Sequence, residues 1–101
     1  MIYEIIFSLT AETDLHLAFE WYEKESHGLG WEFRNEIALC LEKITDDRVS
    51  YQIYFDDIHK IFVARFPYLI YYRKNESQKK IVIAAVLHER RNPEEIKKRL
   101  Q

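Results

Sequence analysis

The sequence predicts an α+β fold: an N-terminal strand, a helical hairpin packed on a mainly antiparallel sheet of four to five strands, and a short C-terminal helix. Three observations support this prediction. Apolar residues recur at helical spacing in the first half of the chain, aromatic and β-branched residues gather in short runs of the second half, and both glycines fall in one break between helical stretches. With 101 residues, the chain can bury the core of one domain without disulfides, so we expect a single domain over residues 1–101.

The first helix is predicted directly after an entering strand. Residues 2–7 alternate weakly between apolar and polar, as a strand does, and residues 10–25 then change to helical spacing. The apolar positions of this helix are Ala11, Leu15, Ala18 and Tyr22. Ser8 or Thr10 can cap it, because a hydroxyl oxygen there accepts a hydrogen bond from an otherwise unpaired amide of the first turn.

A second helix is predicted after the break at residues 26–30, which contains both glycines. It runs from about residue 31 to residue 45, and its apolar positions are Phe33, Ile37, Cys40, Leu41 and Ile44. Such a short turn makes the two helices an antiparallel hairpin, whose apolar faces are expected to bury against the sheet. Trp21 lies off the apolar stripe of the first helix, beside Leu17, so that helix has a second apolar side that needs covering.

The second half of the chain is predicted to form the rest of the sheet. The expected strands are residues 51–55, 61–66, 68–72 and 81–87. Pro67 lies between two of them, and residues 75–78 close the hairpin before the last strand. Asn92 as N-cap and Pro93 at the first helical position predict the short C-terminal helix. Because the helical hairpin covers one face of the sheet, we expect the other face to be partly open.

The two halves of the chain carry opposite charge. Residues 1–50 contain four Lys and Arg against eleven Asp and Glu, which gives −7, and residues 51–101 contain eleven against six, which gives +5; together they give the formal net charge of −2. Such a division indicates either that the second half meets an anionic partner or that the two halves attract each other within one fold. Both explanations are open at this point.

Several classes of protein are disfavoured by the composition. The single cysteine, Cys40, cannot form an intramolecular disulfide, and its place on an apolar helical face predicts a buried thiol. His16, His27 and His59 show no metal-ligand spacing, so we expect no metal and no cofactor. No stretch is apolar enough to span a membrane, and Glu4 interrupts the opening apolar run, so we expect a cytoplasmic protein without a signal peptide.

Cations mark the ends of the predicted strands. Arg65, Arg73, His88, Arg90 and Arg91 lie where strands meet turns, so the sheet is expected to carry a basic rim that binds a target. Arginine can grip a phosphate or a carboxylate through two hydrogen bonds at once. The alternative explanation is structural: His88 can simply end a strand, and Arg90 and Arg91 can bridge to the acidic helices.

Three segments together resemble a known family. The residues Gly28 to Gly30, the segment RFPYLIYY from Arg65 to Tyr72 and the segment HERRNP from residue 88 to Pro93 are similar to the RelE/ParE superfamily of toxins from bacterial type II toxin–antitoxin systems. The resemblance is closer to the ParE-like branch and covers nearly the whole chain. It implies a small toxin that is neutralised by a cognate antitoxin, in a dimer or a toxin–antitoxin hetero-oligomer. The implied target is DNA gyrase or, alternatively, messenger RNA on the ribosome.

Inhibition of gyrase without catalysis is the leading hypothesis. A metal-independent ribonuclease would need a proton carrier and cations around the phosphate, for which His88, Arg65 and Arg91 are the candidates. Two features disfavour this activity. Related nucleases place a tyrosine or similar catalytic side chain near the C-terminus, where this chain continues as a capped helix, and Glu89 beside the histidine would repel phosphate. A member that only binds its antitoxin is the third hypothesis.

Overall fold

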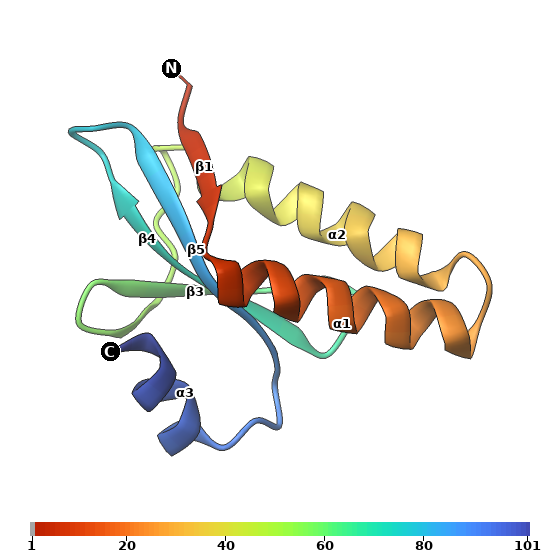
Figure 1. Ribbon diagram of the computed structural model, residues 1–101. Helices are drawn as coiled ribbons and strands as arrows, with labels where there is room; N and C mark the ends of the chain where they lie inside the picture. The colour runs from red at the N-terminus through yellow and green to blue at the C-terminus, as the bar shows by residue number, and fades with distance from the viewer. Residues whose placement is uncertain (1) are drawn as a thin grey trace.

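The computed structural model describes residues 2–101 and confirms the predicted α+β fold (Figure 1). Its elements are β1 (Glu4–Phe7), α1 (Leu9–Glu25), α2 (Leu29–Ile44), β2 (Ile53–Phe55), β3 (Ile58–Phe62), β4 (Tyr68–Asn75), β5 (Lys80–His88) and α3 (Pro93–Leu100). The strand order in the sheet is β1-β5-β4-β3-β2, so the first strand lies beside the last. β1 pairs with β5 in parallel, and the other neighbouring strands are antiparallel, as predicted.

The turn between α1 and α2 explains why the second helix begins earlier than predicted. Gly28 has a φ of 90°, which favours glycine, and α2 starts directly after it at Leu29 rather than near residue 31. Gly30 lies inside the first turn of α2, where an added Cβ would come within 2.6 Å of the Phe19 carbonyl oxygen. The Glu23 carboxylate accepts hydrogen bonds from the amides of both glycines, which lowers the pKa of Glu23. The two glycines therefore allow close helix packing as well as a turn.

The α1–α2 hairpin covers one face of the sheet and forms the main core with it. The buried side chains of this core include Ala11, Ala18, Phe33, Ile37, Cys40, Ile44, Ile61, Ile70, Tyr72, Ile81, Ile83 and Val86. Burial raises the pKa of the Cys40 thiol, as expected of a structural cysteine. Leu41, which the helical stripe predicts to be buried, is only half-buried, because it borders a small hollow beside Phe7 and Leu15.

A smaller core lies on the opposite face of the sheet, beneath α3. Its buried side chains are Ile58, Leu69, Tyr71, Ala85, Leu87, Ile96 and Leu100. Figure 1 shows α3 apart from α2, and the Arg99 side chain of α3 reaches Asp14 of α1. This face is only partly covered, as expected: alternation along β3 places Phe62 on it, and the Phe62 side chain is 60% exposed.

Some boundaries differ from the predicted ones for local reasons. The strand predicted over residues 61–66 is present but displaced, because β3 begins at Ile58 and ends at Phe62. Arg65 has a φ of 71°, which a strand cannot contain, and the Val63 amide closes the turn by donating to the Tyr68 carbonyl. β2 has three residues rather than five. α1 is capped by Ser8, so it begins one residue before the prediction.

Candidate functional site

The predicted site residues divide between the two ends of the β4–β5 hairpin. Tyr68 pairs with His88 where β4 begins and β5 ends, whereas Arg73 pairs with Val82 near the connecting turn. Tyr68 and Arg73 are separated along β4 by about 16 Å, at the usual strand rise of about 3.3 Å per residue. The structure therefore separates Arg73 from the residues at the His88 end.

His88 is fixed at the end of β5 through both its ring and its backbone. Its Nδ1 accepts a hydrogen bond from the Arg90 amide at 3.0 Å, and its carbonyl oxygen accepts one from the Arg91 amide at 3.0 Å. The imidazole packs on the Tyr68 ring with 5.4 Å between the centroids. Because the Nδ1 lone pair is occupied, the proton of the neutral ring lies on Nε2. The Nδ1 lone pair of His88 is therefore engaged by the backbone of the same turn.

Arg90 and Arg91 present their side chains to solvent at the same end. Both residues are exposed, and Arg90 forms no ion pair with any residue in 2–101. Arg91 has one carboxylate nearby, that of Glu95 in α3, with 3.8 Å between Nε and Oε2. An exposed pair at that separation contributes little, so both guanidinium groups are available to an external anion.

Arg65 and Arg73 are instead engaged inside the molecule. Arg65, in the turn before β4, donates from Nη2 to the Glu32 carboxylate of α2 at 2.6 Å. Arg73 donates from Nε to the Asp57 carboxylate at 3.1 Å and from Nη2 to the Leu100 carbonyl oxygen at 3.0 Å. These two arginines connect the sheet to α2 and α3, a structural role that the sequence suggests only for Arg90 and Arg91.

A hollow of about 240 Å³ lies beside His88, between the end of β5 and α1. Two exposed apolar side chains of α1, Leu17 and Trp21, contribute to its lining. Burial raises the pKa of the Tyr68 phenol, which also lines the hollow and therefore stays protonated near neutral pH. We define the strand-end surface as four of the residues that line this hollow together with the two neighbouring arginines: Leu17, Trp21, Tyr68, His88, Arg90 and Arg91.

An ion pair that the sequence did not predict lies next to this surface. The Asp14 carboxylate of α1 accepts hydrogen bonds from the Arg99 side chain of α3 and, at 3.0 Å, from the Val86 amide of β5. Three elements therefore meet at one carboxylate. In the sequence, Arg99 is one of three cations in the last turn of a short helix, and no local pattern indicates that it reaches α1.

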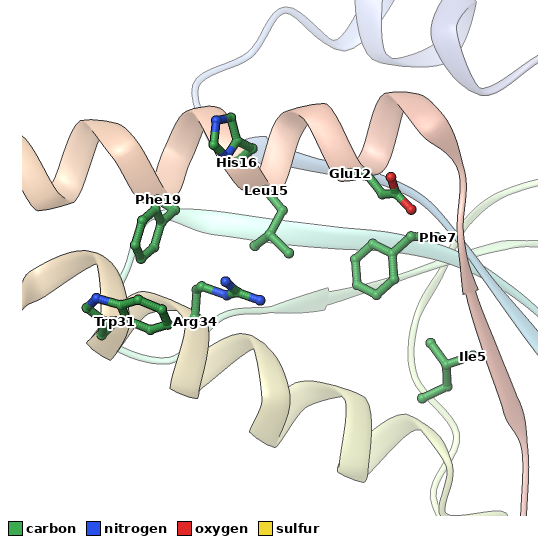
Figure 2. A pocket seen from close by; sticks show the side chains of 8 residues that line it. All are labelled: Ile5, Phe7, Glu12, Leu15, His16, Phe19, Trp31 and Arg34. Atoms are coloured by element: carbon green, nitrogen blue, oxygen red, sulfur yellow. The ribbon is translucent and has the colours of Figure 1, made fainter.

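A larger groove of about 630 Å³ lies between α1 and α2, beside β1 (Figure 2). Its lining side chains are Ile5, Phe7, Glu12, Leu15, His16, Phe19, Trp31 and Arg34. The guanidinium of Arg34 lies over the Phe19 and Trp31 rings, 5.8 and 5.5 Å from their centroids. Figure 2 shows Leu15 and Phe7 directed into the space between the helices. Such a groove is suited to an apolar helix or an extended segment.

The strand-end surface offers several hydrogen-bond donors. The two guanidinium groups, the imidazole Nε2 and the Tyr68 hydroxyl can each donate to a carboxylate or a phosphate. Across residues 2–101, no three His, Cys, Asp or Glu side chains are grouped so that they could hold a metal ion. No helix in the described part of the chain has the length and apolar character needed to cross a membrane. The arrangement is suited to binding an anionic group.

Comparisons with known proteins agree with this fold. A family model described as "ParE toxin of type II toxin-antitoxin system, parDE" matches residues 5–93. A solved structure of the chromosomal ParDE system from P. aeruginosa is similar with a TM-score of 0.71 and 12% identity, over 86% of this chain and 96% of that chain. The E. coli toxin RelE, an arginine-to-alanine double mutant in the free state, is similar with a TM-score of 0.50 and 14% identity, over 89% of this chain and 86% of that chain. No curated protein matches the sequence.

Proposed function

Because the chain belongs to the family of ParE toxins of type II toxin–antitoxin systems, we propose that it acts by binding and inhibiting DNA gyrase. The strand-end surface lies within residues 5–93, the part of the chain that matches the family. In this proposal Arg90, Arg91 and His88 contact the target. Arg65 and Arg73, which are engaged by groups of the toxin itself, support the fold.

The observation that carries this proposal is the hydrogen bond that engages Nδ1 of His88. A ribonuclease of the RelE type would need a group that accepts a proton from the attacking hydroxyl. His88 is the proton carrier that the sequence suggests, but its Nδ1 already accepts a hydrogen bond from the Arg90 amide. Burial raises the pKa of the nearby Tyr68, so its phenol stays protonated near neutral pH and is not available to accept a proton. The engaged Nδ1 of His88 and the protonated Tyr68 phenol support an inhibitor rather than a nuclease.

The cognate antitoxin is the expected partner of a toxin in a type II system, and we place it in the α1–α2 groove. The groove is lined mainly by apolar side chains of the first half of the chain, with Glu12 and Arg34 among them, whereas the second half has a net charge of +5. An amphipathic or extended segment fits the groove, and acidic residues that extend beyond the groove would be attracted to the basic second half, which would give a toxin–antitoxin hetero-oligomer. We expect the association rate to fall as salt is added. A rate that does not change with salt would remove the electrostatic part of this proposal.

The target is tested by a supercoiling assay with purified gyrase and the full-length toxin, together with induction of the toxin without its antitoxin. We expect the wild-type chain to inhibit supercoiling and to cause filamentation with DNA damage. The double variant Arg90→Ala plus Arg91→Ala should lose both effects. The variant His88→Gln should keep most of them, because glutamine retains a donor near the Nε2 position and no proton transfer is required.

The matched control is Lys97→Ala plus Lys98→Ala, which removes the same charge from α3. Both lysines are exposed, and neither forms an ion pair within the described residues, so this variant should remain toxic. Loss of toxicity in a folded His88→Gln, with immediate arrest of translation and cleaved transcripts on induction of the wild-type chain, would favour a ribosome-dependent endoribonuclease. Absence of any growth arrest by the wild-type chain, with intact antitoxin binding, would indicate an inert antitoxin-binding member.

A further inference from the structure

We propose that the strand-end surface contains an anchor site formed by Leu17 and Trp21 of α1, which takes an apolar side chain from an acidic protein segment. Arg90 and Arg91 bind a carboxylate of the same segment. This inference rests on the proposed function, because the segment belongs to the target of the toxin. It adds two residues of α1 to a surface that the sequence indicates only through its cations.

The first support is the exposure of two large apolar side chains on one flank of α1. Leu17 is 62% exposed and Trp21 is 60% exposed, although α1 already buries its other side against α2 and the sheet. They are four residues apart, so they neighbour each other on the helix. Tryptophan is enriched among the residues that dominate binding energy at protein interfaces. Apolar side chains that gather at a hollow mark an interaction site more strongly than single exposed ones.

The size of the hollow limits what can occupy it. Its volume of about 240 Å³ is below the range of about 300–1,000 Å³ that is usual for small-molecule sites. The lining combines the two apolar side chains with the neutral Tyr68 hydroxyl and the guanidinium of Arg91. One apolar side chain with an acidic neighbour in its sequence fits this combination better than a cofactor does.

The charges around the hollow favour a protein segment over a nucleic acid. Asp14 also lines it, but its carboxylate is already bound to Arg99 and to a backbone amide. Arg90 and Arg91 are therefore the main available positive charges beside the hollow, and two arginines suffice for one or two carboxylates. Tracking a nucleic acid backbone takes several phosphate contacts.

The test is the affinity of full-length toxin variants for purified gyrase subunits, measured by calorimetry. Trp21→Ala should weaken binding by about thirtyfold or more, as expected for a tryptophan at the centre of an interface. Leu17→Ala should weaken it by about tenfold. The matched control is Leu9→Ala, on the same helix and 82% exposed but outside this hollow, which should bind within about twofold of wild type. Melting temperatures of all variants should stay close to wild type.

The outcomes separate this inference from the choice of gyrase as target. If wild-type toxin binds gyrase and Trp21→Ala binds equally well, the anchor site is wrong and the proposed function stands. If wild-type toxin arrests growth without binding gyrase, the proposed target is wrong, and growth arrest then decides the anchor site. Retained arrest in a folded Trp21→Ala would overturn it, whereas loss of arrest with a toxic Leu9→Ala would support it. Strongly salt-dependent binding to RNA that Trp21→Ala leaves unchanged would also overturn it.

Discussion

The two ends of the β4–β5 hairpin both carry cations, but three of those at the turn end, Arg73, Lys74 and Lys79, are paired within the molecule. At the turn end, Lys74 and Lys79 lie 3.0 and 3.3 Å from the Asp47 carboxylate. At the other end, Arg90 has no ion pair within residues 2–101, and Arg91 has only a distant one. The difference shows that the position of a cation at a strand end does not decide its role. Its role depends on whether an acidic side chain lies against it.

This difference also resolves the meaning of the opposite charges of the two halves. Cations of the second half reach acidic residues of the first half at three places: Arg65 contacts Glu32, the two lysines contact Asp47, and Arg99 contacts Asp14. Attraction between the halves therefore accounts for part of the division. The cations that stay unpaired, Arg90 of the strand-end surface among them, remain available to an external anionic partner.

The largest expected loss of stability is at the ion pair between Arg99 of α3 and Asp14 of α1, which lies next to the strand-end surface. The side chains of Arg99 and Asp14 are 22% and 11% exposed, so Arg99→Ala leaves a carboxylate without its charged partner. We expect a loss of about 3 kcal/mol in the free energy of unfolding, measured by urea denaturation. The double variant Asp14→Asn plus Arg99→Met should recover most of it. A loss in Arg99→Ala below about 0.5 kcal/mol would mean that the pair is not structural.

A smaller loss is expected at the turn end. Arg73→Ala removes the hydrogen bond to the Leu100 carbonyl oxygen and the exposed pair with Asp57. We expect a loss of about 1 kcal/mol, because solvent replaces both contacts in part. Hydrogen exchange should show faster opening of α3 in this variant, and growth arrest should be retained. Lost growth arrest at unchanged stability would move Arg73 to the target-binding residues.

The Asp47 cluster at the turn end should give the stability of the fold a pH dependence. A hydrogen bond from the Tyr3 hydroxyl, at 2.5 Å, and the nearby Lys74 lower the pKa of Asp47 from 3.8 to about 2. A carboxyl group whose pKa is lowered by folding stabilises the fold above its unfolded pKa, and this contribution disappears as the pH falls through the folded pKa. Between pH 3.8 and about 2, the melting temperature of Asp47→Asn should therefore fall less steeply than that of wild type. Parallel curves would contradict this assignment.

The smallest effect on stability is expected at the strand-end surface itself. Arg90→Ala plus Arg91→Ala should change the free energy of unfolding by less than about 0.5 kcal/mol, because neither guanidinium has a close partner in the described residues. The same variant is the one expected to lose toxicity. A clear drop in its melting temperature would show that both ends of the hairpin use their cations for the fold.

Much of the architecture was predictable from local patterns. The apolar spacing of Ala11, Leu15 and Ala18 predicts α1, and the Asn92-Pro93 pair predicts the start of α3. Turn chemistry was harder to read. The predicted strand over residues 61–66 extends too far toward the C-terminus, because Arg65 adopts a φ of 71° that its residue type does not indicate.

The sequence by itself determined the α+β class, the helical hairpin and the gathering of cations at strand ends, because these depend on residues within about one or two turns of each other. Only the tertiary structure decided which cations are bound and which are available. Arg99 and Asp14 are 85 positions apart in the chain, and Arg65 and Glu32 are 33 apart. The same holds for Trp21. The sequence shows that it lies off the apolar stripe of its helix, but only the packing of α1 beside β5 places it next to His88. Contacts between distant segments depend on how the elements pack, and no local spacing encodes them.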